Sequence, residues 1–280
     1  MAETPTWKEA EPPELRAPYL RESVRGGVRV TILILITMFG LVLFSLGRIL
    51  KWAFGPRVTF HYGVARLWAR TCLALFAVRR VVNGQPIRRG GVLASNHASW
   101  MDIISLRSVT RINFVSKAEE RKWPVVGYIA EVCETVFIER RRSEAKRQQA
   151  ELAARVHNDE LLCIFPEGTS TDGLRVLPFK STLMSVVFIE GIHEQAFVQP
   201  VTIHYQPDEA LGLPRNFYGW WGSMAFESHI WTVATRSRGG KVEITFHEPL
   251  KARDFSDRKL LTQTCETAVR SAMPQALQAG

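Results

Sequence analysis

The stretch NHASWMD, residues 96–102, stands between two short apolar runs, and the chain is organised around it. The preceding run, Gly91 to Ser95, has the length and composition of a buried strand, and Ile103 to Leu106 follows as the beginning of a helix. His97 therefore falls at a strand end. Asp102 follows in the first turn of the helix, where its carboxylate can reach one imidazole nitrogen and leave the other free as a general base.

A helix cap is the competing interpretation of the same stretch. Ser99, followed three residues later by Asp102, resembles a capping box with Asp in the place of Glu or Gln, and such a box starts a helix without any chemistry. The stretch alone leaves both interpretations open, so other parts of the chain have to decide between them.

Charge separates the N-terminal part of the chain from the rest. The 280 residues suffice for one large α/β domain with an appendage. Between residues 21 and 80, ten basic residues accompany one acid, and this net charge of +9 equals that of the whole protein. The basic block surrounds the longest uncharged apolar stretch, Val30 to Gly47, which indicates a membrane surface rather than nucleic acid. The four cysteines are scattered without metal-ligand spacing and suit the reducing, cytosolic side.

We expect three regions along the chain. Residues 1–20, with their many Pro and Glu, are expected to be a disordered tail. Residues 21–80 are expected to anchor the protein: the 18 residues 30–47 are just long enough for a transmembrane helix, with a re-entrant or interfacial helix as the alternative. Residues 58–78 predict a basic amphipathic helix, either at the membrane interface or packed on the domain. Residues 81–280 are expected to form the catalytic domain.

Apolar runs that alternate with helical patterns predict an α/β fold, a mixed and mostly parallel sheet flanked by helices, with a membrane-associated helical segment at the N-terminus. The expected later strands are 113–116, 135–138, 161–165, 197–205 and 241–246, and the expected later helices are 143–157, 181–190 and 256–273. In such sheets the loops at strand ends carry the site. His97, Arg140 and Glu167 all fall at predicted strand ends.

Two further stretches supply candidate binding residues, each with an unexceptional alternative. Arg140, within a run of three arginines and with Lys117 nearby, suits a phosphate, although a solvated charge run before a helix has the same composition. Glu167, Gly168 and Thr169 follow a strand and suit a polar headgroup, although a turn that caps a helix looks the same.

Together, four ordered blocks within about residues 85–250 resemble the glycerolipid acyltransferases, and most of all the 1-acylglycerol-3-phosphate (lysophosphatidic acid) acyltransferases. The blocks are Asn96-His97 with Asp102, Phe137 to Arg140, Phe165 to Ser170, and Val198 to Val201. The chain departs from the family pattern at Glu139, where Asp is frequent, and at Gln199, where an aliphatic residue is usual. Residues 220–231 are similar to bacterial members, some of which acylate lyso-ornithine lipid.

The resemblance implies a membrane-bound lysolipid O-acyltransferase. It would move a fatty acyl group from acyl-coenzyme A or acyl carrier protein to 1-acylglycerol-3-phosphate, giving phosphatidic acid for phospholipid synthesis. Lyso-ornithine lipid is the alternative acceptor, and a non-catalytic membrane-anchored lipid-binding protein is a distant alternative. The implied site consists of the base and its orienting acid, His97 and Asp102, and of residues that position the acceptor, Arg140, Glu167, Gly168 and Thr169, with Lys117 and Pro200 as additions.

The same resemblance implies no cofactor beyond the acyl donor and no metal, and it places the catalytic domain on the cytoplasmic face of a membrane, the bacterial inner membrane. A serine hydrolase is disfavoured because the chain has no Gly-x-Ser-x-Gly motif. Nucleic acid is not an expected partner, because the basic block is tied to an apolar helix. Phe179, Met184 and Val198 are candidates either for an acyl-chain groove or for plain core.

Overall fold

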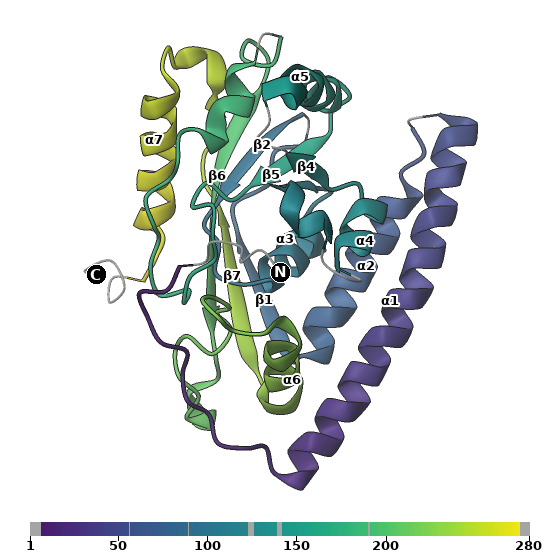
Figure 1. The fold of residues 1–280 in the computed structure, drawn as a ribbon, viewed down its shortest axis with the longest axis vertical. Coiled ribbons are helices and arrows are strands. Elements are labelled where there is room, and N and C mark those ends of the chain that lie inside the picture. Colours follow the sequence, from purple (N-terminus) through teal and green to yellow (C-terminus); the bar gives the residue numbers. More distant parts are fainter. Residues whose placement is uncertain are drawn as a thin grey trace.

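A mixed sheet forms the centre of the molecule in the computed structural model, which describes residues 7–55, 57–88, 90–122, 126–138, 142–189 and 191–274 (Figure 1). The strands are β1 Val78–Asn83, β2 Gly91–Ser95, β3 Asn113–Lys117, β4 Val136–Ile138, β5 Leu161–Ile164, β6 Phe197–Gln206, β7 Gly240–Phe246 and β8 Leu250–Lys251. Their order is β1-β7-β6-β2-β5-β3-β4, with β8 also paired to β6. The pairs are parallel, except that β6 runs antiparallel to β7 and β8. The predicted mixed, mostly parallel sheet is confirmed.

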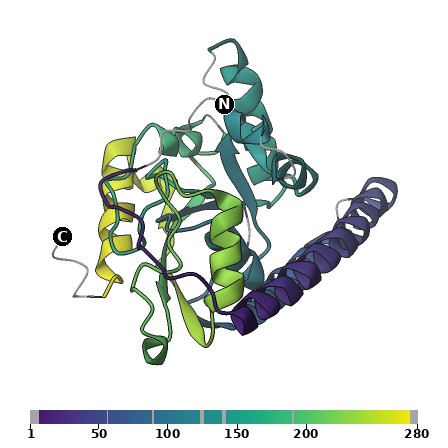
Figure 2. The same cartoon turned by 60° about the horizontal axis from the view of Figure 1, so that its bottom comes forward.

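Helices cover both faces of this sheet. The α-helices are α1 Leu20–Phe54, α2 Phe60–Leu75, α3 Met101–Val109, α4 Val126–Val132, α5 Arg142–His157, α6 Phe226–Arg236 and α7 Arg258–Ser271, and the short 3-10 helices are η1 Ala118–Lys122, η2 Leu183–Phe188, η3 Glu209–Leu211 and η4 Ala252–Asp254. In β2, Leu93 joins a core with α2, α3 and α6, whereas Val92 and Ala94 join a second core with α5 and α7. Figures 1 and 2 accordingly place α7 and α1 on opposite sides of the molecule.

The central strand β2 fixes the position of the stretch that follows it. All five of its residues are buried, and it pairs with β5 on one side and β6 on the other. Ala94 lies opposite Ile164 of β5 and Pro200 of β6. Because parallel strands end at the same edge of a sheet, the segments that leave β2 and β5 emerge side by side.

Two predicted helices differ from the structure. The helix predicted over residues 58–78 ends at Leu75, because Ala77 adopts a left-handed backbone with φ 54° and Val78 begins β1, which pairs with β7. The helix predicted over residues 181–190 is instead the 3-10 helix η2. Met184 is fully buried there, and with Phe179 and Val198 it belongs to the second core, so these three residues are core rather than groove.

Helix α1 is 35 residues long, nearly twice the predicted apolar span, and is long and apolar enough to cross a membrane. One of its faces packs along α2 and α6. A Cβ on Gly47 would lie 2.8 Å from the backbone nitrogen of His61, and the Trp68 indole donates to the Thr37 hydroxyl at 3.0 Å. At its N-terminal end, Arg29 donates to the carbonyl oxygens of Ala234 at 3.0 Å and Ser237 at 2.8 Å. The helix is therefore held lengthwise against the domain.

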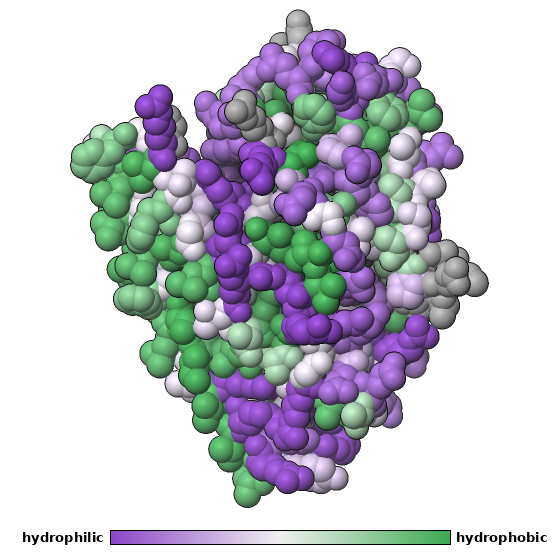
Figure 3. All heavy atoms as spheres, turned by 180° about the vertical axis from the view of Figure 1, so that it is seen from behind, coloured by the Kyte–Doolittle hydropathy of each residue, from purple (hydrophilic) through white to green (hydrophobic). Residues whose placement is uncertain are grey.

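The opposite face of α1 is apolar and exposed. Leu35, Phe39, Val42 and Trp52 are each more than 60% exposed. Figure 3 shows hydrophobic residues gathered in a band on the side of the molecule where α1 lies. A continuous exposed apolar face of this kind marks contact with a membrane or a partner.

Residues 7–19 are not the free tail that their composition predicts, although residues 1–6 lie outside the described part of the chain. Trp7 is only 7% exposed, and its ring packs on Trp221 with the centroids 6.5 Å apart. Its backbone N–H donates to the Thr169 hydroxyl at 3.0 Å, and the Trp221 indole donates to the carbonyl of Ala10 at 2.8 Å. The segment then runs along the outside of the domain to α1 (Figure 1). A few specific contacts thus order a segment that lacks apolar periodicity.

Candidate active site

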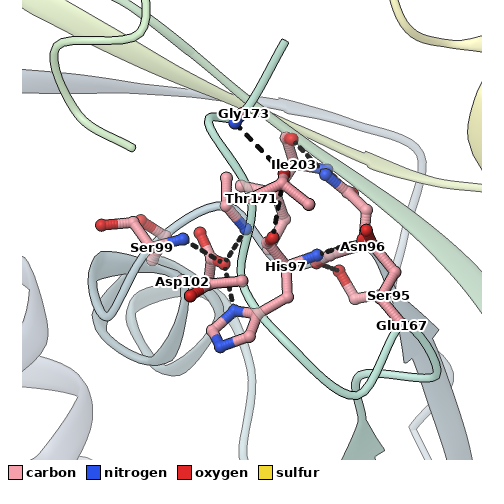
Figure 4. A network of polar contacts seen from close by, with 12 residues as sticks. Ser95, Asn96, His97, Ser99, Asp102, Glu167, Thr171, Gly173 and Ile203 are labelled. Carbon is pink, nitrogen blue, oxygen red and sulfur yellow. Dashed lines mark hydrogen bonds and ion pairs between the residues drawn. The ribbon is translucent and has the colours of Figure 1, made fainter. Parts of the chain in front are cut away.

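His97 leaves the end of β2 and meets Asp102 in the first turn of α3 (Figure 4). Its Nδ1 lies 2.7 Å from Asp102 Oδ2, and its ring stacks on Phe165 with the centroids 4.1 Å apart. Asp102 is fully buried, whereas the His97 side chain keeps 18% exposure. Because the carboxylate accepts a hydrogen bond from Nδ1–H, Nε2 is left with a free lone pair, which is the arrangement a general base requires.

Asp102 also caps the helix, so the two interpretations of this stretch hold together. Its Oδ2 accepts hydrogen bonds from the backbone N–H groups of Ala98 at 2.7 Å and Ser99 at 3.0 Å. The Ser99 hydroxyl has no partner among the described residues, so only the carboxylate half of a capping box is formed. The bonds to Ala98 and Ser99 fix the carboxylate against the turn and thereby fix the imidazole that it contacts.

Glu167 follows β5 at the same sheet edge and holds the backbone of the histidine. Its side chain is buried, Oε1 accepts from the backbone N–H of His97 at 2.7 Å, and Oε2 accepts from that of Leu177 at 2.9 Å. Burial raises the pKa of Glu167 to about 8, while the hydrogen bonds from Leu177 and His97 act in the opposite direction. Both carboxylate oxygens are therefore committed to the protein.

Gly168 and Thr169 continue this loop. Gly168 has φ 71°, and a Cβ there would lie 3.2 Å from Lys180 Nζ and 3.3 Å from Leu183 Cδ1, so both conformation and space favour glycine. The Thr169 hydroxyl accepts from Trp7 and donates to the Ser170 carbonyl at 3.2 Å.

The loop returns to the histidine two residues later. The backbone N–H of Thr171 donates to the His97 carbonyl at 3.0 Å, and that of Trp220 donates to the Ala98 carbonyl at 2.9 Å. Backbone contacts thus join three distant segments around His97.

The remaining predicted residues are placed less directly. Arg140 and the side chain of Lys117, whose backbone ends β3, lie outside what the structure describes. Pro200 is buried within β6, opposite Ala94, and its carbonyl accepts from His247 N–H at 3.1 Å. It lies inside the sheet rather than on the loops at its edge.

Gln199, the departure from the family pattern, has a structural explanation. Its Oε1 accepts from the Ile87 N–H at 2.9 Å, and its Nε2 donates to the carbonyls of Gln85 at 2.9 Å and His247 at 2.8 Å. The polar side chain is buried and ties the segment before β2 to the segment after β7.

Three side chains around the site had no role assigned from sequence. Asn96 is buried and bridges β2 to β6, donating to the Ile203 carbonyl at 2.9 Å and accepting from its N–H at 2.8 Å. The Trp100 indole donates to Nδ1 of His229 in α6 at 2.8 Å, and burial lowers the pKa of His229 to about 4, so this imidazole is neutral. Asn96 directly precedes the histidine, a signal that sequence offers, whereas nothing in the spacing of Trp100 and His229 indicates their contact.

Comparison with known proteins identifies the family. A family model described as Acyltransferase matches residues 78–204. The chain is 40% identical to the lyso-ornithine lipid O-acyltransferase of Rhodobacter capsulatus, over 97% of this chain and 98% of the relative, and 26% identical to a 1-acyl-sn-glycerol-3-phosphate acyltransferase of Neisseria gonorrhoeae, over 66% and 69%. The fold resembles that of the 1-acyl-sn-glycerophosphate acyltransferase of Thermotoga maritima, with a TM-score of 0.60 at 22% identity, covering 91% of this chain and 98% of that one. The predicted resemblance is confirmed, and the protein belongs to the acyltransferase family.

Proposed function

We propose that this protein is a lyso-ornithine lipid O-acyltransferase, which moves a fatty acyl group from a thioester donor to the free hydroxyl of lyso-ornithine lipid. The observation that carries the proposal is the 40% identity with such an enzyme over nearly the full length of both chains. The sequence alone favoured 1-acylglycerol-3-phosphate as acceptor, and the comparisons support the alternative acceptor better.

The two candidate acceptors differ in the charged groups of their headgroups. Recognition of a phosphate relies on guanidinium or ammonium groups, whereas an ornithine headgroup carries a carboxylate and an ammonium group instead of a phosphate. The acids of the loop after β5 do not distinguish the two, because both are already paired within the protein: Glu167 accepts from two backbone N–H groups, and Asp172 pairs with Arg175. Lys117 and Arg140 remain proposed contacts for the anionic part of the acceptor.

We assign the proton transfer to His97. Its Nε2 takes the proton of the acceptor hydroxyl while the oxygen attacks the thioester carbonyl, and Asp102 stabilises the imidazolium that forms. When the tetrahedral intermediate collapses, the carbon–sulfur bond breaks and the leaving thiolate takes the proton back from His97. The donor is acyl-coenzyme A or acyl carrier protein, and the reaction needs no cofactor or metal. Glu167 contributes by holding the backbone of His97, and Gly168 and Thr169 by shaping the loop beside it.

The two faces of α1 suit a helix that lies between the domain and a membrane. A lysolipid acceptor resides in a bilayer, and the exposed apolar face of α1 gives the domain a way to associate with one. Because the other face packs on α2 and α6, perpendicular insertion would carry these helices into hydrocarbon. Of the two predicted arrangements, we therefore propose the interfacial one, with the catalytic domain on the cytoplasmic face of a bacterial inner membrane.

Acyl transfer to a choice of acceptors tests the proposal. Purified protein in mixed micelles receives radiolabelled acyl-coenzyme A or acyl carrier protein, with lyso-ornithine lipid or 1-acylglycerol-3-phosphate as acceptor. We expect label in ornithine lipid and a loss of roughly 10²- to 10⁴-fold in kcat for His97→Ala. The matched control is His157→Ala, at the exposed end of α5. A higher kcat/KM with 1-acylglycerol-3-phosphate would overturn the acceptor, and full activity of His97→Ala would overturn the mechanism.

A further inference from the structure

The two carboxylate oxygens of Asp102 differ in their hydrogen bonds among the described residues. The three hydrogen bonds to this side chain, from His97, Ala98 and Ser99, all end on Oδ2, and the dashed lines in Figure 4 converge on that one oxygen. Oδ1 has no partner among the described residues. A buried carboxylate oxygen without a donor is costly, and it matters most in the group that has to stabilise an imidazolium.

A buried hydroxyl pair lies close to the Asp102 carboxylate, whose charge acts on one of its two members. Ser105 lies one turn after Asp102 in α3 and therefore on the same face of the helix. Its Oγ is 2.9 Å from the hydroxyl of Tyr205, which reaches it from β6, and both side chains are buried. Burial first, and then the charge of Asp102, keep the pKa of Tyr205 well above its usual range, so its hydroxyl keeps its proton and is available as a donor.

We propose that Tyr205, supported by Ser105, is a positioning residue for the catalytic pair: its hydroxyl donates to the free oxygen of Asp102, and the Ser105 hydroxyl donates to Tyr205. The proposal rests on the assignment of His97 and Asp102 as base and orienting acid. It extends their contact to a chain of four groups, Ser105, Tyr205, Asp102 and His97. With Oδ2 fixed by the turn and Oδ1 by Tyr205, the carboxylate plane cannot rotate away from the imidazole when the positive charge forms.

The fold offers a matched control. Tyr218 is also buried, its ring lies 5.8 Å from that of Tyr205 between centroids, and its hydroxyl contacts Ser237 Oγ at 2.7 Å. Tyr205→Phe and Tyr218→Phe therefore each remove one buried hydroxyl bonded to a serine. The two variants should lose similar thermal stability, so a difference in activity cannot come from folding.

The experiment measures acyl transfer for both variants with whichever acceptor the wild type uses. We expect Tyr205→Phe to lose roughly 10- to 100-fold in kcat, the size of one hydrogen bond to a charged group, with KM within about twofold of wild type. Tyr218→Phe should keep its kcat within about threefold.

A double-mutant cycle shows whether Tyr205 acts through Asp102. In an Asp102→Asn background, Tyr205→Phe should cost little more than Asp102→Asn alone. An unchanged kcat for Tyr205→Phe, or the same fold-loss with and without Asp102, would overturn the inference. Failure of the proposed function would look different, since the wild type would then transfer no label to lyso-ornithine lipid while these ratios could still be read with another acceptor.

Discussion

Replacement of Trp7 by Ala tests whether the N-terminal segment is part of the active site. The ring is 7% exposed, packs on Trp221 and lies under the Arg175 guanidinium, 4.9 Å from the ring centroid. Truncation of a buried Trp costs about 3 kcal/mol or more, which changes the ratio of docked to released segment by about 100-fold. Release removes the donor to Thr169 and the acceptor of the Trp221 indole.

Limited proteolysis reports this release directly. Lys8 and Arg16 are exposed within the segment, and trypsin cleaves such sites at a rate proportional to the fraction of molecules in which the segment is undocked. We expect the initial rate of cleavage to rise about 100-fold at Lys8 in Trp7→Ala, and to rise less at Arg16, which is held by contacts of its own. Acyl transfer should fall about tenfold, because the loop that contacts His97 loses one hydrogen bond. Leu260→Ala is the control, since Leu260 is 53% exposed on α7, away from α1.

Two results would refute this reasoning. An unchanged cleavage rate in Trp7→Ala would mean that the segment is held by contacts other than the ring. Faster cleavage with unchanged acyl transfer would mean that docking of the segment is not coupled to the catalytic loop, whatever its contact with Thr169.

Two further predictions concern the loop after β5. Glu167 has its pKa raised from the usual 4.5 to about 8, so it favours folding at low pH and this stability is lost as pH rises from about 4.5 to 8. Relative to Glu167→Gln, which does not titrate, the wild type should lose up to roughly 5 kcal/mol of unfolding free energy over that window. Thermal unfolding in detergent measures this difference, and a difference that does not change with pH would contradict the prediction. Gly168→Ala should lose about 2 kcal/mol of unfolding free energy and part of its activity. Gly212→Ala should lose less, because Gly212 has φ 59° but a Cβ there would have nothing within 4 Å. Equal losses in the two variants would refute the steric argument.

The part of the site that could be predicted is the part encoded in short stretches. The strand Gly91–Ser95 and the placement of His97 at its end follow from an apolar run bounded by polar residues, and the structure has both. The neighbourhood of His97 and Glu167 follows from parallel pairing of β2 and β5. Local pattern and one topological rule were sufficient for these.

The remainder depends on contacts between distant residues. Trp7 and Thr169 are 162 positions apart, and the segment around Trp7 has the Pro-rich, polar composition of a disordered tail. The segment is ordered by the contact of two aromatic rings and by a few hydrogen bonds, and such contacts cannot be predicted from amino-acid composition. Likewise, Glu167 was expected to contact the acceptor because a carboxylate after a strand suits a headgroup. Its burial, which turns it toward the backbone of His97 and Leu177, is a property of the packed loop rather than of the motif.

The double role of Asp102 explains why sequence could not choose between a cap and a catalytic pair. A carboxylate in the first turn of a helix points back along the chain, where the N–H groups of the preceding turn are unpaired. The spacing of five residues places His97 at the strand end within the same reach, so a single oxygen accepts from the imidazole and from two backbone donors. The backbone bonds hold the carboxylate in place whether or not the imidazole is charged. The hydrogen bonds that cap the helix thus also keep Asp102 oriented toward His97, so a substitution that removes the cap would also impair the catalytic pair.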